Sequence, residues 1–314
     1  MKQKINSILV AFRLRTLPAV LGPLFISISI IITNDFNLFK VVLIIFIGIL
    51  LQILVNLIND LEDSKKGIDN ENRVGPLRAI QSGLLTKLEI KLLIYFILIL
   101  CLVLGTIAFF ISGIFTIIMG LILLFLAYTY TGGPKPYGYM GLGEITVMIV
   151  FGPFTVLGSL YLFSIHATYE NILISVIPGL SASLIILVNN IRDLDNDKKG
   201  GKNTIAVKLG EIKSRYLFVG ILYIIFIILI SLTFILQNLL ILIPAFIIWY
   251  FFPIKDFGFN KKKFIFMSFD LEKSKKLGEL NITLIKTVKS HFFLCTVLSI
   301  SIIIWPYIAE ILGS

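Results

Sequence analysis

The chain has 314 residues, of which 57% are hydrophobic and 15% charged, and its mean hydropathy is +0.98. Soluble globular domains are usually about 45–50% apolar, so this composition excludes an ordinary soluble domain. The formal net charge of +10 could indicate nucleic-acid binding, but the long apolar blocks favour a membrane protein whose basic residues set its orientation, with no nucleic-acid partner.

Nine segments are long and apolar enough to cross the hydrocarbon core of a bilayer, which takes about 20 residues of helix. Backbone polar groups in lipid must be satisfied within the segment, so these spans are predicted helices. The expected fold is therefore an all-α integral membrane protein, a single domain over residues 1–314. The predicted spans are residues 17–33, 41–58, 92–111, 113–131, 143–163, 171–190, 216–236, 238–254 and 288–307.

The basic residues are divided unevenly between the two ends of these spans. Of the 28 Lys and Arg residues, 27 lie on the side of the N-terminal arm and every second loop, and only Lys40 lies on the other. Because cytoplasmic loops carry the excess of Lys and Arg, we expect a multi-pass protein of the cell membrane with a cytoplasmic N-terminus and an external C-terminus. The long polar loops, including the longer loop at 255–287, are then cytoplasmic.

A polar stripe closes the second span. Asn56, Asp60 and Asp63 stand at i, i+4 and i+7, so on a helix they share one face. Ionisable groups at this depth are costly and usually line a pathway or a site.

A matching stripe, Asn190, Asp193 and Asp197, closes the sixth span. Each stripe alone could be a solvated helix end. Their matched positions instead suggest two four-helix halves plus a ninth helix, with the stripes facing each other across a central cavity open to the cytoplasm. Four carboxylates with no His or Cys nearby suit a hard cation, and magnesium completes such a site with water and phosphate oxygens.

Basic residues flank both stripes and could bind phosphate, although most lysines in such loops only set orientation. Arg78 ends a Gly-Pro turn, which fixes its backbone. Lys202 follows a Gly-Gly pair, which lets the backbone approach an anion closely. Together with Arg15, these are the better candidates; Lys66 and Arg73 complete the predicted set.

Residues 128–144 form a Gly- and Pro-rich, aromatic junction that ends in an intramembrane acid. Aromatic side chains at this depth are often only an interfacial belt, but the Gly and Pro density favours a shaped loop over a pocket. Tyr128, Tyr130 and Glu144 are therefore candidates to orient an acceptor, with Asn59 and Asn189 beside the acid stripes.

The ordered set of these motifs resembles the UbiA-type intramembrane prenyltransferase superfamily. The resemblance covers residue 13 to about 300 and is carried by 13–18, 59–69, 73–86, 130–134, 141–144, 189–210 and 281–287. Gly67 stands where the general superfamily motif has an aspartate, and Asp69 follows two residues later. This departure favours the branch that prenylates 1,4-dihydroxy-2-naphthoate in menaquinone synthesis over the 4-hydroxybenzoate branch. The Lys-rich link at 255–276 is longer than expected, and Phe264, Phe266 and Phe269 suggest a surface helix.

The resemblance implies nine transmembrane helices and Mg²⁺-dependent transfer of a polyprenyl group from its diphosphate to an aromatic acceptor. Asp60, Asp63, Asp193 and Asp197 would hold the metal, assisted by Asn56 and Asn190. The partners implied are polyprenyl diphosphate, an aromatic acceptor and the lipid bilayer.

Other functions are compatible with parts of the pattern. Within the enzyme class, the acceptor could be 4-hydroxybenzoate, another quinone precursor or a lipid alcohol. A secondary transporter would place its acids near helix centres, often beside broken helices, whereas here they stand at cytoplasmic ends.

Overall fold

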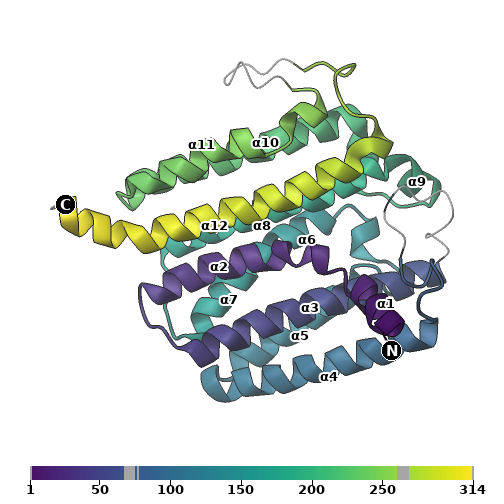
Figure 1. Cartoon of the computed structure of the whole chain (residues 1–314), viewed down its shortest axis with the longest axis horizontal. Coiled ribbons are helices and arrows are strands. Elements are labelled where there is room, and N and C mark those ends of the chain that lie inside the picture. Colours follow the sequence, from purple (N-terminus) through teal and green to yellow (C-terminus); the bar gives the residue numbers. More distant parts are fainter. Residues whose placement is uncertain (1, 67–74, 76–77, 260–268, 313–314) are drawn as a thin grey trace.

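The computed structural model describes residues 2–66, 75, 78–259 and 269–312. Over these residues the chain is helical, and the one β-bridge joins Phe259 to Phe269. The long helices run nearly parallel or antiparallel to one another as a single bundle, whereas α1 (Lys2–Phe12) is bent by 55° from α2 (Pro18–Ile32) (Figure 1). In chain order they are α1 (Lys2–Phe12), η1 (Leu14–Thr16), α2 (Pro18–Ile32), α3 (Leu38–Lys65), α4 (Lys87–Ser112), α5 (Ile114–Thr129), η2 (Tyr137–Tyr139), α6 (Gly143–Ile149), η3 (Val150–Phe154), α7 (Thr155–Leu162), α8 (Tyr169–Arg192), α9 (Leu194–Lys199), α10 (Ile205–Ile235), η4 (Leu239–Ile241), α11 (Leu242–Phe251), η5 (Ile254–Phe257), η6 (Leu277–Glu279) and α12 (Leu280–Leu312).

Every segment predicted to span the membrane coincides with helix, which confirms an all-helical membrane fold in the described residues. Six helical stretches there are long and apolar enough to cross a bilayer, or seven if the bent pair of α1 and α2 is one span. Two predicted spans, at α5 and at η4 with α11, are shorter apolar helices. The number of crossings therefore stays a prediction.

The buried apolar side chains form two clusters. The larger cluster joins α2, the start of α3, α7, α8, α10, α11 and α12, and the smaller joins α1, the later part of α3 and α4. The last helix, α12, packs against α2 and α8 and lies between α2 and the α10–α11 pair (Figure 1). The arrangement of two four-helix halves plus a ninth helix stays a prediction.

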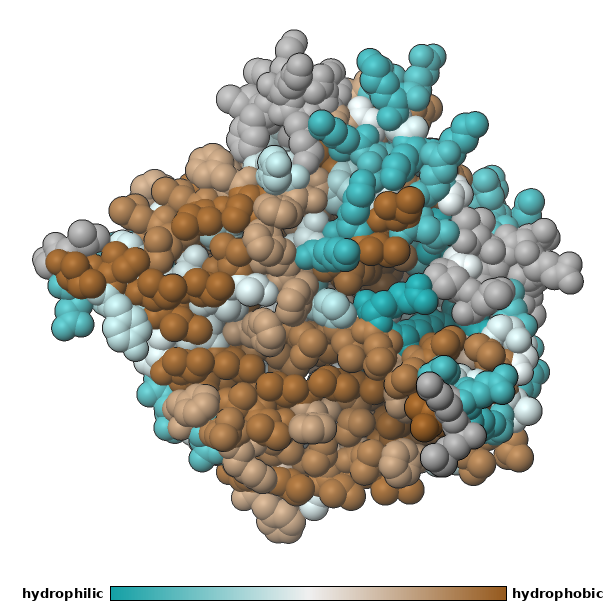
Figure 2. Space-filling view, viewed as in Figure 1, coloured by the Kyte–Doolittle hydropathy of each residue, from teal (hydrophilic) through white to brown (hydrophobic). Residues whose placement is uncertain are grey.

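Polar and apolar surfaces separate along the bundle axis. In Figure 2 the surface over most of the helices is apolar, and hydrophilic residues gather toward the end that carries α1 and α9. The N-terminus lies at this polar end, and α12 runs to the opposite end (Figure 1). Both acid stripes therefore lie at the end that is least compatible with lipid.

A break in the fifth predicted span brings its start close to α8. Gly152, with φ −100° and ψ −105°, interrupts the helix beside Pro153. A Cβ atom on Gly179 of α8 would lie 2.1 Å from the carbonyl oxygen of Met148, so only glycine allows this approach. Because α6 and α8 touch along their backbones, side chains at their polar ends meet.

The loop after α11 is held by a buried arginine of α10. Arg215 is fully buried, and its guanidinium donates to the carbonyl oxygens of Asp256 (3.3 Å) and Lys275 (2.6 Å) and pairs with Glu211. The Asp256 carboxylate accepts from Thr283 at 2.8 Å.

The prediction of a surface helix in this loop is wrong at Phe269. This residue forms a bridge with Phe259 and packs on Tyr216, with 5.0 Å between the ring centroids. The isolated bridge leaves no helical backbone at that position. Phe264 and Phe266 lie outside the described residues.

Replacing Arg215 by Ala is expected to lower the free energy of unfolding by about 2–3 kcal/mol, because two carbonyl groups lose their charged donor in a buried site. Denaturant titration in mixed micelles measures this change. Lys213→Ala, at an exposed position of the same helix, is the control and should stay within about 0.5 kcal/mol of the parent. Equal stability of both variants would contradict this role for Arg215.

Candidate active site

The first acid stripe is buried at the polar end of α3. Asp60 and Asp63 are each 1% exposed. Asp60 Oδ2 accepts from the backbone N–H of Ala79 at 3.0 Å, and Asp63 Oδ2 pairs with Arg78 Nη2 at 2.6 Å. Arg78 Nη1 also donates to the carbonyl oxygen of Asn59 at 2.7 Å. The turn before α4 therefore folds back over α3 and neutralises its acids.

The second stripe is organised by Arg192, the last residue of α8. Its guanidinium binds Asp193 through Nε at 2.8 Å and Nη2 at 2.5 Å. It also donates to Asn189 Oδ1 at 2.9 Å and to Asn281 Oδ1 at 3.0 Å. We call this forked guanidinium of Arg192 the fork. Since Asn281 belongs to α12, the fork ties the acid end of α8 to the start of the last helix.

Asp197 lies in the short helix α9 and faces Lys202. Their side chains are 3.4 Å apart, and the backbone N–H of Lys202 donates to the Asp197 carbonyl at 2.8 Å. Gly201 makes this return possible with φ +72°, a left-handed conformation that glycine adopts readily. Burial raises the pKa of Asp197 to about 6, and Lys202 opposes that rise.

The two stripes meet through the loop at 137–143. The Tyr139 hydroxyl donates to Asp63 Oδ1. Two ammonium groups lie against the ring of Tyr139, with Lys66 Nζ 4.8 Å and Lys202 Nζ 4.6 Å from its centroid. One side chain thus touches residues that follow the second and the sixth predicted spans. Tyr139 was not among the predicted site residues, and its tyrosine-rich loop was the only sequence signal for it.

A second contact joins α6 to α8. Asn190 Nδ2 donates to Glu144 Oε1 at 2.8 Å, while Glu144 Oε2 is buried without a hydrogen-bond partner in the structure. Tyr130 lies close by, since a Cβ atom on Gly143 would be 3.5 Å from its ring. Asn190, predicted as a metal ligand, is therefore held by a residue predicted to orient the acceptor.

The other candidates are placed less centrally. Asn56 donates to the Phe12 carbonyl and to Thr16 Oγ1, at 3.1 and 3.0 Å, and so fixes the bend between α1 and α2. Arg15 is exposed within that bend, in η1. Tyr128 is 49% exposed on α5, which makes it the weakest of the residues predicted to orient the acceptor.

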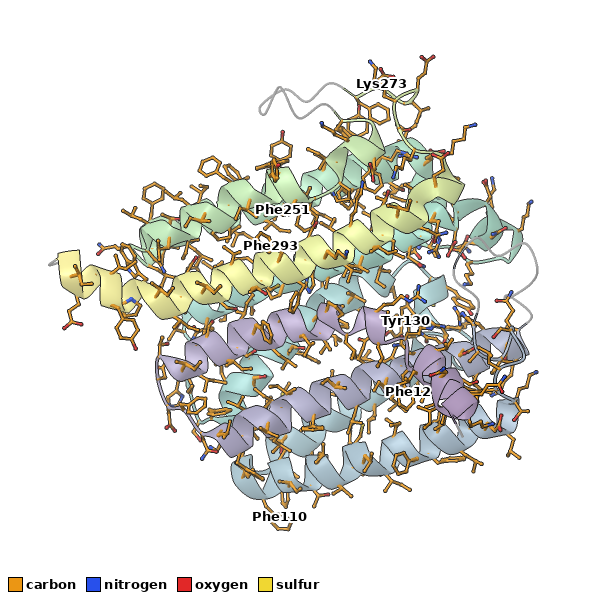
Figure 3. The ribbon with its side chains drawn as sticks, viewed as in Figure 1. Phe12, Phe110, Tyr130, Phe251, Lys273 and Phe293 are labelled. Carbon is orange, nitrogen blue, oxygen red and sulfur yellow. The ribbon has the colours of Figure 1, made fainter. Side chains whose placement is uncertain are left out.

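Two further predicted site residues are Asn59 and Arg73. Asn59 Oδ1 accepts from Thr131 Oγ1 at 2.8 Å, which links α3 to the end of α5. Arg73 lies outside the described residues. In Figure 3, Tyr130 lies toward the same end as Phe12 of α1, and Phe110 of α4 lies toward the other.

The central cavity between the acid stripes stays a prediction. A cavity of about 590 Å³ lies at the opposite end, lined by residues of α10 and α12 that include Phe234 and Trp305.

The donor set at the two stripes fits a hard divalent cation. Its ligands would be carboxylate and amide oxygens, and His291 is engaged elsewhere, by Ser181 and the Ala19 carbonyl. No three His, Cys, Asp or Glu residues in the described ranges are already gathered as a metal site. Arginine or lysine pairs with Asp63, Asp193 and Asp197, and a backbone N–H binds Asp60, so a metal would have to replace these contacts.

Comparison with known proteins gives this arrangement its context. Residues 20–269 match the UbiA prenyltransferase family. The chain belongs to the UbiA prenyltransferase family. It is 39% identical over 65% of its length to 1,4-dihydroxy-2-naphthoate octaprenyltransferase of Haemophilus influenzae, and 41% identical over 53% to that of Escherichia coli.

The matched regions span 69% and 56% of the two relatives' own lengths. Among solved structures, a UbiA homologue from Archaeoglobus fulgidus bound to GPP and Mg²⁺ superposes with a TM-score of 0.63 at 16% identity, over 95% of this chain and 99% of that one. At this identity the likeness establishes the UbiA fold.

Proposed function

We propose that this UbiA-family chain transfers a polyprenyl group from polyprenyl diphosphate to 1,4-dihydroxy-2-naphthoate, with loss of CO₂ and diphosphate, to form demethylmenaquinol, the reduced form of demethylmenaquinone. The contact of Tyr139 with Asp63 on one side and Lys202 on the other carries the proposal, because it joins the two acid motifs at one place. The names of the two bacterial relatives support the choice of acceptor.

The diphosphate head would bind where the two motifs meet. Asp60, Asp63, Asp193 and Asp197 would hold magnesium, with the side-chain oxygens of Asn56 and Asn190 as additional donors. When bound, magnesium stabilises negative charge on the leaving diphosphate as the allylic C–O bond lengthens.

Basic residues of the site would neutralise the rest of the diphosphate charge. Arg78 and Lys202 already stand beside the acids, at Asp63 and Asp197. Guanidinium binds two phosphate oxygens at once, whereas ammonium acts as a point charge. We assign Arg15 and Lys66 to the same role at the edge of the site, and Arg73 to the same role from its place in the sequence motif.

Chemistry at the prenyl carbon needs a dry environment, because water would capture the developing allylic cation. Burial of the helix ends that carry the acids supplies this dry environment on the protein side. The ring of the acceptor would attack the cationic carbon, after which its carboxylate leaves as CO₂. Glu144 and Tyr130 would orient the acceptor, with Asn59, Asn189 and Tyr128 as further candidates.

The membrane arrangement belongs to the same proposal. Nine crossings would place the acid stripes at the cytoplasmic face, where both substrates' polar groups are accessible, with the N-terminus cytoplasmic and the C-terminus outside. The polyprenyl tail would then lie along the apolar interior of the bundle or in the bilayer.

Membranes that contain the protein should convert 1,4-dihydroxy-2-naphthoate and one prenyl diphosphate into a prenylated product lighter by CO₂, identified by mass. The same membranes should leave 4-hydroxybenzoate unchanged. The reverse selectivity would overturn the naphthoate assignment, and no product from any aromatic acid would overturn the proposed reaction. Membranes with Asp60→Asn protein serve as the background control.

A further inference from the structure

Tyr139 makes three kinds of contact at the junction of the acid motifs, two through its side chain and one through its backbone. Its hydroxyl donates to Asp63, its ring lies against two lysine ammonium groups, and its carbonyl accepts from the backbone N–H of Asn203 at 2.8 Å. A residue used only for packing needs none of these polar partners.

The two lysines come from opposite halves of the bundle. Lys66 is the C-terminal cap of α3, and its ammonium donates to the Thr131 carbonyl at 2.6 Å. Lys202 follows α9 and pairs with Asp197. The ammonium groups of both lysines lie near one aromatic ring. The negative face of such a ring attracts cations within about 6 Å of its centroid.

This arrangement leaves hydrogen-bonding capacity on the ammonium groups. Each ammonium carries three donors. Lys66 uses two of them for the Thr131 and Gly133 carbonyls and Lys202 uses one for Asp197, so each keeps a donor for a phosphate oxygen. Two positive charges held at the same ring repel each other, and a polyanion that binds both ammonium groups relieves that repulsion. The ring therefore keeps both lysines in position for an anion with several oxygens.

Resting on the proposed function, we propose that Tyr139 is a positioning residue of the diphosphate site: its ring holds the Lys66 and Lys202 ammonium groups for the diphosphate, and its hydroxyl keeps the ring over the acid motifs. The ligand class is an organic diphosphate. Tyr139 acts through the two lysines and makes no contact with the reacting carbon.

The test measures binding of a slowly reacting prenyl thiodiphosphate by calorimetry to purified protein in detergent at saturating Mg²⁺. Tyr139→Leu removes the ring and is expected to weaken binding about tenfold, the effect of two lost cation–π contacts. Tyr139→Phe keeps the ring and should bind within about threefold of the parent. The KM for the aromatic acceptor should be the same in all three proteins.

Tyr137→Phe is the matched control. Tyr137 belongs to the same short helix, and its hydroxyl donates to the Leu126 carbonyl at 3.0 Å. This variant should bind the analogue like the parent. A Tyr139→Leu protein that is folded and binds the analogue as tightly as the parent would overturn the inference, whereas a parent that does not bind it would overturn the proposed function.

Fluorinated phenylalanines at position 139 provide a test that does not alter side-chain shape. Successive fluorine atoms reduce the negative potential of the ring face. Affinity for the thiodiphosphate should fall stepwise with fluorine number. An affinity independent of fluorination would show that the ring contributes only shape and would contradict the proposed role.

Discussion

Asp60→Asn and Asp193→Asn should each reduce prenyl transfer by about a thousandfold, because metal-assisted departure of a charged leaving group supplies several kcal/mol of transition-state stabilisation. Each change preserves side-chain size while removing one negative charge from an acid stripe. The initial rate of product formation by purified protein with Mg²⁺, both substrates and detergent measures the effect. Full activity in both variants would remove the metal assignment.

Asp195 offers a matched control for that experiment. It lies between Asp193 and Asp197 in the sequence, but its side chain is exposed on α9. Asp195→Asn makes the same change of charge and is expected to keep the parent rate within about twofold, as exposed surface substitutions usually have small effects. A large loss in this variant would mean that net charge at this end of the bundle, and no particular carboxylate, controls the rate.

Arg192→Ala should lower the free energy of unfolding by about 3–5 kcal/mol, since it leaves a paired carboxylate and two amide oxygens without their buried cation. Arg192 is 2% exposed and contacts Asp193, Asn189 and Asn281. Denaturant titration in mixed micelles measures the loss. Arg192→Lys should fall between Ala and the parent, because an ammonium cannot reproduce the planar fork.

Lys199→Ala is the control for the Arg192 variants, because Lys199 is exposed at the end of α9. It removes one positive charge a few residues away without touching the fork, and its stability should be that of the parent. If Lys199→Ala and Arg192→Ala lost equal stability, the fork would have no special part in holding α8 to α12.

The fold was predictable from sequence because lipid imposes a simple rule: long apolar segments must be helices. The acid stripes were equally accessible, since Asp60 and Asp63 repeat at helical spacing within an apolar segment. Shorter segments were harder. The α5 and η4–α11 segments are apolar throughout, and composition alone does not give the length over which such a segment remains helical.

The partners of the acids could not be predicted from spacing. Asn190 reaches Glu144 only because Gly179 and Gly152 let α6 and α8 approach closely, a contact between segments far apart in the chain. Tyr139 reaches Asp63 by the path of a Gly- and Pro-rich loop. Phe269 looked like part of an amphipathic surface helix, but it pairs with Phe259 beside Tyr216. The local sequence pattern does not predict such tertiary contacts.

The most direct measurement is the position of Mn²⁺, by anomalous scattering, in crystals of the protein with a prenyl thiodiphosphate. Manganese accepts the same oxygen ligands as magnesium. The account predicts anomalous peaks between the ends of α3 and α9, within coordination distance of at least one carboxylate from each stripe and of the diphosphate. Peaks that touch only one stripe, or lie away from both, would contradict it.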